Sequence, residues 1–359
     1  LMGMLDGYDH VFDDPAQETD ISLAFDIKVA QRSGAKSRRK VLRVGGMRPL
    51  RSLFGNPINK AALLAAIRRF DAIIVLNREL YQLFSELHSN VTLIPNGIDI
   101  EVWKPVDSPK PTRFVVGFAG SIVNEKERAI KGYDLLVEAC KKADVRLVST
   151  TKGDTQIPND RMRSAFYKKI DLLVHPVGPG KEGCSNVLTE AMALGVPVLT
   201  TVDCGFHADF DPSETGLFLT SRNVDDLAAR ITDLKNDIQA RIKARRTGRQ
   251  FVRLHQDLGV VSRAYDGVFQ GVLNSESEEE TALDLRISRA QGKRIVQFVP
   301  FWQPLDEPAT GRLRNRQPAD YLGRHTTQFK TLVGDLAGQR MVDVVFMSQL
   351  ATDETLVWA

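Results

Sequence analysis

The most regular hydrophobic pattern in the chain lies between Asp171 and Thr201. It opens with an apolar run, Leu172 to Val174, which is typical of a strand buried on both faces of a sheet. Ser185 then predicts a helix start and Gly195 a helix end, and Val196 to Thr200 predicts a second strand. Apolar residues between them share one helical face: Val187, Leu188, Ala191 and Leu194. The stretch therefore predicts a β-α-β unit.

Short apolar segments and helical segments alternate along the rest of the chain. Strands are predicted at His10–Phe12, Lys40–Val44, Asp71–Leu76, Val91–Pro95, Phe114–Ala119 and from Thr215. Helices are predicted at Ser22–Gln31, Asn59–Arg69, Glu79–Leu87, Asp225–Leu234 and within Gln250–Leu273. Such alternation favours an α/β fold with parallel sheets, because parallel strands need crossover connections.

The loop from Gly178 to Ser185 lies where a ligand is expected. In open parallel sheets, ligands bind outside the carboxyl ends of the strands. The loop contains Glu182, and Glu190 follows in the predicted helix with seven residues between the two. A carboxylate accepts two hydrogen bonds at once, which suits the vicinal diol of a ribose or a hexose. The alternative is that Glu182 is solvated and Glu190 is an ordinary surface residue of the helix.

An ordered set of motifs resembles glycosyltransferase family 4 (glycosyl transferases group 1) of the GT-B fold. Its donor domain carries a Glu, seven residues and a Glu, followed by EAMA-x-G-x-P-V. Here this motif spans Glu182 to Val198. The other family-like pieces are IPNGID at Ile94–Asp99, GFAGS at Gly117–Ser121, KGYDLL at Lys131–Leu136 and ETGLFL at Glu214–Leu219. The resemblance covers roughly residues 70 to 270 and is only loose before them.

The resemblance implies a sugar transfer from a nucleotide-diphosphate donor with retention of anomeric configuration. It assigns Glu182 to hydroxyls of the donor sugar, Glu190 to the ribose and Lys131 to the diphosphate, with Glu182 and Lys131 as the catalytic candidates. The implied donor-binding set is Gly120, Ser121, Lys131, Glu182, Gly183, Cys184, Ser185, Asn186, Val187 and Glu190. No cofactor is implied apart from the nucleotide sugar as substrate.

The chain departs from the family pattern in two places. Ser121 stands nearest the position where family members carry an Arg, and Lys126 or Arg128 in the following loop is a possible substitute. The glycine-bearing loop that opens the family's amino-terminal domain has no counterpart, so we expect the first β-α units to be missing. His10 is the one candidate on the acceptor side, although a plain structural histidine is the simpler interpretation.

The domain boundaries follow from composition. Pro105, Pro109 and Pro111 mark a linker, which separates an acceptor-side Rossmann-like domain, 1–107, from a donor-binding domain, 108–273. Residues 274–292 are acidic and predict a second linker. A strand at Arg294–Pro300, a helix at Thr326–Leu336 and a strand at Val342–Met347 predict the beginning of a further α/β domain at 293–359. The expected fold is therefore GT-B-like, with two Rossmann-like parallel-sheet domains, the first incomplete, and the start of a third module.

Composition and charge bear on membrane spans, cysteine chemistry and nucleic-acid binding. The 359 residues are 43% hydrophobic and 26% charged with a net charge of +3, and the apolar runs are shorter than the ~18 residues of a membrane span. The three cysteines lack C-x-x-C spacing, which indicates neither a disulfide framework nor a zinc site. Arg245, Arg246 and Arg249 are interpreted as a solvated helix face, so nucleic acid is an unlikely partner. We expect a cytoplasmic protein, with peripheral attachment at the inner membrane face left open.

A bound metal is not expected. Asp209 and Asp211 form a D-x-D tripeptide, but they precede Pro212 in turn-rich sequence, and Asx turns explain them. Two other functions stay open beside a transferase. One is a degenerate domain that binds nucleotide or scaffolds a partner, and the other is a nucleotide-sugar epimerase on the same fold.

Overall fold

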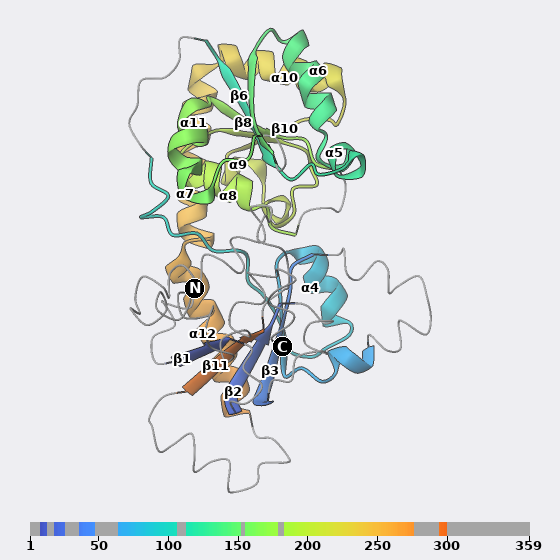
Figure 1. Ribbon diagram of the computed structural model, residues 1–359, viewed down its shortest axis with the longest axis vertical. Coiled ribbons are helices and arrows are strands. Elements are labelled where there is room, and N and C mark those ends of the chain that lie inside the picture. The colour runs from blue at the N-terminus through green and yellow to red at the C-terminus, as the bar shows by residue number, and fades with distance from the viewer. Residues whose placement is uncertain are drawn as a thin grey trace, which may run out of the picture. The chain divides into compact units, whose positions relative to one another are not determined.

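The computed structural model describes residues 8–12, 18–25, 36–46, 64–105, 113–151, 155–178, 183–275 and 294–299 (Figure 1). They divide into two compact units. The first contains the described residues up to Ile94 and those from Val261 onwards, and the second runs from Pro95 to Val260. The chain thus enters the second unit at Pro95, ahead of the predicted boundary at residue 107.

The first unit is built on a six-stranded sheet in the order β1-β11-β2-β3-β4-β5. Every neighbouring pair is parallel. The strands are β1 Tyr8–Phe12, β2 Glu18–Ala24, β3 Lys36–Val44, β4 Ala72–Val75, β5 Val91–Leu93 and β11 Arg294–Val299. Helix α4, Arg78–Ser85, joins β4 to β5. This arrangement confirms the predicted parallel α/β fold.

One prediction in this unit is wrong. Ser22 to Ala24, predicted as the start of a helix, belongs to strand β2, because β3 and β11 pair with it on both sides. The strand predicted from Arg294 is present as β11 and lies between β1 and β2. The helix and strand predicted after it, like most of the linker at 274–292, lie outside the described residues.

The core of the first unit is closed by the last described helix. Helix α12, Leu258–Asn274, packs Val261, Tyr265, Phe269 and Val272 against buried residues of β2, β3 and β4. Arg43 donates a hydrogen bond to the Tyr265 hydroxyl at 2.7 Å inside this core. The prediction of helices within Gln250–Leu273 is therefore confirmed, and α12 contributes to the core of the first unit.

The second unit has a five-stranded parallel sheet in the order β10-β9-β8-β6-β7. Its strands are β6 Val115–Gly120, β7 Arg146–Thr151, β8 Leu172–His175, β9 Val198–Thr200 and β10 Leu217–Leu219. Its helices are α5 Glu125–Lys131, α6 Tyr133–Lys142, α7 Asn159–Arg161, α8 Asn186–Ala193, α9 Pro212–Thr215, α10 Val224–Asn236 and α11 Ile238–His255, with a π-turn at Met162–Phe166 and 3-10 turns at Tyr167–Lys169 and Phe206–Asp209.

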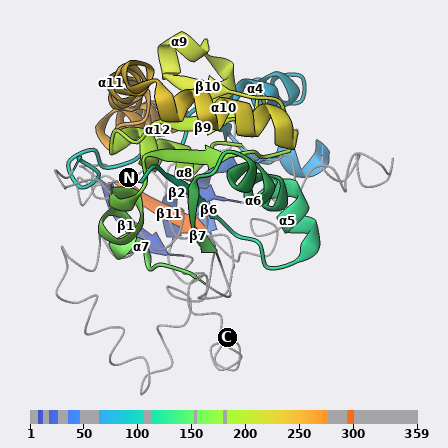
Figure 2. The same ribbon diagram turned by 90° about the horizontal axis from the view of Figure 1, so that it is seen from above.

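Strand order in the second unit places the candidate site. From β6 the chain moves outward to β7, whereas from β8 it moves in the opposite direction through β9 to β10. Helices α6 and α10 cover one face of the sheet, and α8, with α11 packed against it, lies on the other (Figure 2). The strand order therefore reverses between β6 and β8, and ligands of doubly wound sheets bind outside the carboxyl ends at such a point.

None of the described helices is long and apolar enough to cross a membrane.

Candidate functional site

The β-α-β unit predicted between Asp171 and Thr201 is present. Strand β8 is buried throughout, α8 begins after the N-cap residue Ser185, and β9 pairs in parallel with β8. Gly195 follows the end of α8 with a φ of 69°, a left-handed conformation that favours glycine. The local signals in the sequence were therefore sufficient to predict this part of the site.

Lys131 lies on a turn that is held against the loop after β8. It is the last residue of α5, and Gly132 behind it has a φ of 66°. A Cβ at Gly132 would lie 2.3 Å from the carbonyl oxygen of Pro176, so only glycine fits. The N–H of Gly178 donates to the carbonyl oxygen of Ile130 at 2.8 Å. The structure thus brings Lys131 to the carboxyl end of β8.

Arg222 reinforces this contact and was not foreseen from the sequence. Its Nε donates to the carbonyl oxygen of Pro176 at 3.2 Å, and its guanidinium also donates to the carbonyl oxygen of Ala129. One side chain therefore joins the α5–α6 turn to the loop after β8. Its partners are backbone carbonyls, which carry no sequence signature, so no motif could have indicated it.

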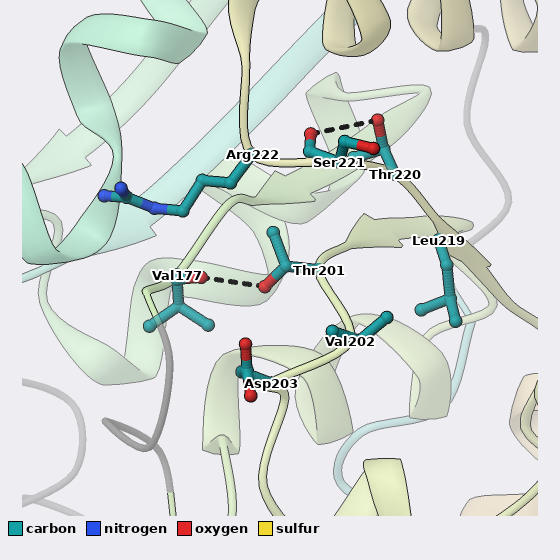
Figure 3. Close-up of a pocket in the computed structure, with 8 residues that line it drawn as sticks. All are labelled: Val177, Thr201, Val202, Asp203, Leu219, Thr220, Ser221 and Arg222. Carbon is teal, nitrogen blue, oxygen red and sulfur yellow. Dashed lines mark hydrogen bonds between the residues drawn. The ribbon is translucent and has the colours of Figure 1, made fainter.

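Arg222 also borders a cavity of about 420 Å³ outside the carboxyl ends of β8, β9 and β10. The lining residues are Val177, Thr201, Val202, Asp203, Leu219, Thr220, Ser221 and Arg222 (Figure 3). The Thr201 hydroxyl donates to the carbonyl oxygen of Val177 at 2.8 Å, which fixes one wall. The cavity offers hydroxyl groups and one carboxylate beside the candidate site.

Gly120 is the last residue of strand β6, which neighbours β8 in the sheet, and Ser121 follows it. The Ser121 hydroxyl donates to the Glu127 carboxylate at 3.2 Å, so it is tied to the first turn of α5. Arg128 and Lys126 are the two possible substitutes for the family's Arg. Arg128 forms a salt bridge with Asp134, with 2.7 Å between Nε and Oδ1, and its guanidinium lies over the Tyr133 ring. Lys126 is exposed.

Helix α8 is buried along its whole length, and Glu190 is fully buried within it. Oε2 of Glu190 accepts a hydrogen bond from the Tyr167 hydroxyl at 2.7 Å. Trp103 packs edge-on against the Tyr167 ring, with centroids 6.0 Å apart. The alternative of an ordinary surface residue is therefore wrong, and a diol could reach this carboxylate only where the surrounding side chains make room.

The predicted residues at the start of α8 are also covered. Cys184, Ser185 and Asn186 are each 2% exposed, and Val187 is 6% exposed. Cys184 pairs with Gly205 in an isolated bridge, and the N–H of Phe206 donates to the carbonyl oxygen of Gly183 at 2.9 Å. Glu182 and Lys181 lie outside the described residues. His10 lies in β1 of the other unit, and its side chain is outside the described part.

The D-x-D tripeptide has the local role that its sequence indicates. Asp211 caps α9 and accepts from the N–H of Ser213 at 2.8 Å, and Glu214 completes a capping box. These hydrogen bonds from Ser213 lower the pKa of Asp211. Within the described residues, no three His, Cys, Asp or Glu side chains gather where they could hold a metal ion.

The three cysteines are buried, and none of them forms a disulfide. Burial raises the pKa of the Cys140 thiol to about 12, so this group stays protonated at neutral pH. It packs in the core between α6 and the sheet.

Comparison with known proteins finds a family match in part of the chain. Residues 155–251 match the family described as Glycosyl transferases group 1. This segment therefore resembles the group 1 glycosyl transferases. The segment includes β8, α8, β9 and Glu190, whereas Gly120, Ser121 and Lys131 precede it. The fold is GT-B, as its solved structural neighbours have it.

Relatives similar to this chain include a capsular polysaccharide biosynthesis glycosyltransferase, CapM of Staphylococcus aureus. The two are 27% identical in an alignment of 158 residues that covers 39% of this chain and 41% of the relative. The aligned part thus spans about two-fifths of that protein.

Among solved structures, HepE of Anabaena in complex with UDP and glucose has a TM-score of 0.56 at 16% identity, covering 70% of this chain and 78% of its own. Sucrose-phosphate synthase of Thermosynechococcus elongatus has a TM-score of 0.55 at 16% identity, covering 72% and 74%. At this identity the likeness shows the fold.

Proposed function

We propose that the chain transfers a sugar from a nucleotide-diphosphate donor to an acceptor, with retention of anomeric configuration. The observation that carries the proposal is the group 1 match at residues 155–251, because it contains the β-α-β unit on which the candidate site is built. HepE was solved in complex with UDP and glucose, which supports a nucleotide sugar as donor. The acceptor is a glycan, a lipid-linked molecule or another hydroxyl compound.

In this proposal Lys131 and the amino end of α8 receive the diphosphate. Both lie at the carboxyl edge where the strand order reverses. Negative charge gathers on the leaving diphosphate in the transition state. A fixed ammonium group and a helix amino end therefore stabilise the transition state more than the bound donor. The backbone at Gly120 and Ser121 borders the same space from β6.

The two glutamates are proposed to divide the donor between them. Glu182 holds hydroxyls of the sugar, and Glu190 holds the ribose diol. The Glu190 carboxylate accepts a hydrogen bond from the Tyr167 hydroxyl at 2.7 Å. To bind Glu190, a ribose hydroxyl must replace the Tyr167 hydroxyl as the donor. Both contacts would be charge-assisted hydrogen bonds, each worth about 1.5–3 kcal/mol.

Calorimetry of the full chain against UDP, GDP, ADP and dTDP tests the proposal. We expect one of the four to bind, and Glu190→Ala to weaken that binding about tenfold or more. Glu182→Ala should leave the diphosphate affinity nearly unchanged and abolish turnover of the nucleotide sugar, because the anomeric carbon is no longer positioned. Absence of binding by all four would favour the degenerate scaffold. Interconversion of free nucleotide sugars without an acceptor would favour the epimerase.

The transfer is proposed to need no divalent metal, since Lys131 and the helix end neutralise the diphosphate. Turnover in EDTA should therefore equal turnover in Mg²⁺ or Mn²⁺. Loss of turnover on chelation that Mn²⁺ restores would contradict this part of the proposal.

Peripheral attachment to an anionic membrane is proposed through helix α11. Its 18 residues include six Arg and Lys and no Asp or Glu. Arg246, Arg249 and Arg253 are exposed and follow one another along one stripe of the helix, while Ile238 and Leu254 are 56% and 58% exposed near its ends. Like charges at this spacing destabilise an isolated helix, and anionic lipid would relieve the repulsion.

Co-sedimentation with phosphatidylcholine vesicles, with and without phosphatidylglycerol, tests this attachment. The wild type should bind only the anionic vesicles, and replacing Arg246, Arg249 and Arg253 together by Gln should weaken binding about 100-fold. Replacing the exposed Lys141, Arg146 and Lys168 by Gln is the matched control. Equal effects of the two triple changes would contradict a role for α11.

A further inference from the structure

A cluster of polar side chains is buried beneath the amino end of α8. Its members come from four separate segments of the second unit, and each is 7% exposed or less: Asn96, Cys184, Asn186, Thr189, His207 and Gln256. Gln256 is fully buried. Buried polar groups destabilise a fold unless they are hydrogen-bonded, so their partners show what the cluster does.

Hydrogen bonds in the cluster run in one direction toward α8. The Gln256 Oε1 can only accept, so His207 Nε2 donates to it at 3.1 Å. Gln256 Nε2 donates to the Thr189 hydroxyl at 2.9 Å. That hydroxyl donates to the carbonyl oxygen of Ser185 at 3.1 Å. A continuous chain of donors thus ends on the N-cap residue of α8.

Asn96 holds the residues on either side of that N-cap. Its Nδ2 donates to the carbonyl oxygen of Cys184 at 3.0 Å and to Oδ1 of Asn186 at 2.7 Å. Gln256 also lies 3.3 Å from the carbonyl oxygen of Asn96, which links the two amides. The Ser185 side chain makes no capping bond to the helix. The start of α8 is therefore held from outside the β-α-β unit.

These hydrogen bonds to carbonyl oxygens also orient the neighbouring backbone N–H groups. A trans peptide is planar, so anchoring the carbonyl of Cys184 also sets the direction of the Ser185 N–H, and anchoring that of Ser185 sets the Asn186 N–H. Both carbonyls face the buried cluster. The carbonyl oxygen of Ser185 also accepts from the N–H of Thr189 at 3.2 Å, as in any first helical turn. Asn96 directly, and Gln256 through the Thr189 hydroxyl, therefore add side-chain anchors to the first peptide planes of α8.

We propose that Gln256 and Asn96 are positioning residues that orient the amino end of α8 for the donor's diphosphate. Neither touches the donor, and each acts through the peptide planes around Ser185. This inference rests on the proposed function, because it assumes that a diphosphate binds at this helix end. It goes beyond it in assigning a functional role to Gln256, which lies after the group 1 match ends at residue 251.

The test compares a nucleoside diphosphate with its own nucleoside in calorimetry of the full chain. The probe is whichever of UDP, GDP, ADP and dTDP the wild type binds most tightly. The dissociation constant of the nucleoside divided by that of the nucleoside diphosphate measures what the diphosphate contacts add to binding by the base and ribose. Gln256→Met should reduce this ratio about tenfold, the effect of misaligning one charge-assisted hydrogen bond. Asn96→Leu should act in the same direction.

Thr215→Val is the matched control, because Thr215 is also fully buried and hydrogen-bonded, to Pro212 and Leu217. It should lower the melting temperature and leave the ratio unchanged. Should Gln256→Met fail to fold, Thr189→Val breaks the donor chain one step nearer the helix and should reduce the ratio as well. An unchanged ratio in a folded variant would overturn the inference. Absence of diphosphate binding by the wild type would instead reject the proposed function.

Discussion

Helices α8 and α10 belong to one unit but begin in different ways. Asn223 caps α10, its side chain accepting from the N–H of Asp226 at 2.9 Å, and two Asp residues lie in the first turn. Helix α10 buries a single face. Helix α8 is buried throughout, has no side-chain cap from Ser185 and no acidic residue in its first turn. Its start is arranged instead by Asn96 and Gln256, which are distant in sequence.

The difference distinguishes a helix end that its own residues stabilise from one that distant residues hold. A side-chain cap satisfies the orphan N–H groups of a helix end, and acidic residues there complement its dipole. Both devices stabilise α10, and both would compete with an anionic ligand. At α8 the Ser185 side chain makes no capping bond, and the first turn holds no acidic residue. Two substitution pairs and one pH comparison test this contrast.

The largest effect is expected from the carboxylate buried in α8. Glu190→Ala removes the nearer acceptor of the Tyr167 hydroxyl and opens a cavity in a fully buried helix, so the free energy of unfolding should fall by about 2–4 kcal/mol. Asp225→Ala in α10 removes a carboxylate that is 77% exposed and paired with Lys142, and should stay within about 0.5 kcal/mol of the wild type. Urea denaturation measures both. Similar losses in the two variants would show that α8 and α10 do not differ in this respect.

A smaller effect separates the two N-caps. Asn223→Ala removes a capping bond and should lower the free energy of unfolding by about 1 kcal/mol. Ser185→Ala removes a hydroxyl without a capping role and should lower it by about 0.5 kcal/mol or less. Thermal unfolding monitored by circular dichroism is sufficient. An equal loss at Ser185 would mean that its side chain does cap α8 in solution.

The smallest effect concerns pH. Hydrogen bonds from Asn223, and then from Ser221, lower the pKa of Asp226 below its ordinary value of 3.8. A depressed pKa stabilises the fold above the pKa of the unfolded chain, and this contribution is lost as pH falls through the lower folded pKa. The melting temperature should therefore drop slightly below pH 4. The drop should be smaller in Asn223→Ala, because the first cause of the shift is gone. Identical acid profiles of variant and wild type would argue against the Asn223 contact.

The fold was predictable wherever the signals were local. Leu172 to Val174, Ser185 and Gly195 lie within one β-α-β unit, and the apolar run, the N-cap residue and the helix-ending glycine each have a local physical meaning. Ser22 to Ala24 failed because a short apolar segment fits a helix as well as a strand until its neighbours are known. The place of Arg294–Val299 depends on pairing with strands some 270 residues away, which no local pattern encodes.

The site was predictable only as a set of residue types. The motif containing Glu190 was visible, but its burial against Tyr167 depends on packing between elements. Gln256 and Arg222 belong to no motif, because their partners are backbone carbonyls, a hydroxyl, a thiol and an imidazole. Such partners occur in every sequence. The supporting residues of the site therefore became visible only in the structure.

The Arg222 contact has a consequence for how the protein is made. The turn that carries Lys131 is bound to Arg222, with 93 positions separating Ala129 from that side chain. During synthesis the amino-terminal part of the second unit leaves the ribosome well before Arg222 exists. The contact with Arg222 can form only after β10 has been made. The hydrogen bond from Gly178 to Ile130, in contrast, needs only residues that are made earlier. Arg222 therefore secures a turn that can already lie against the loop after β8.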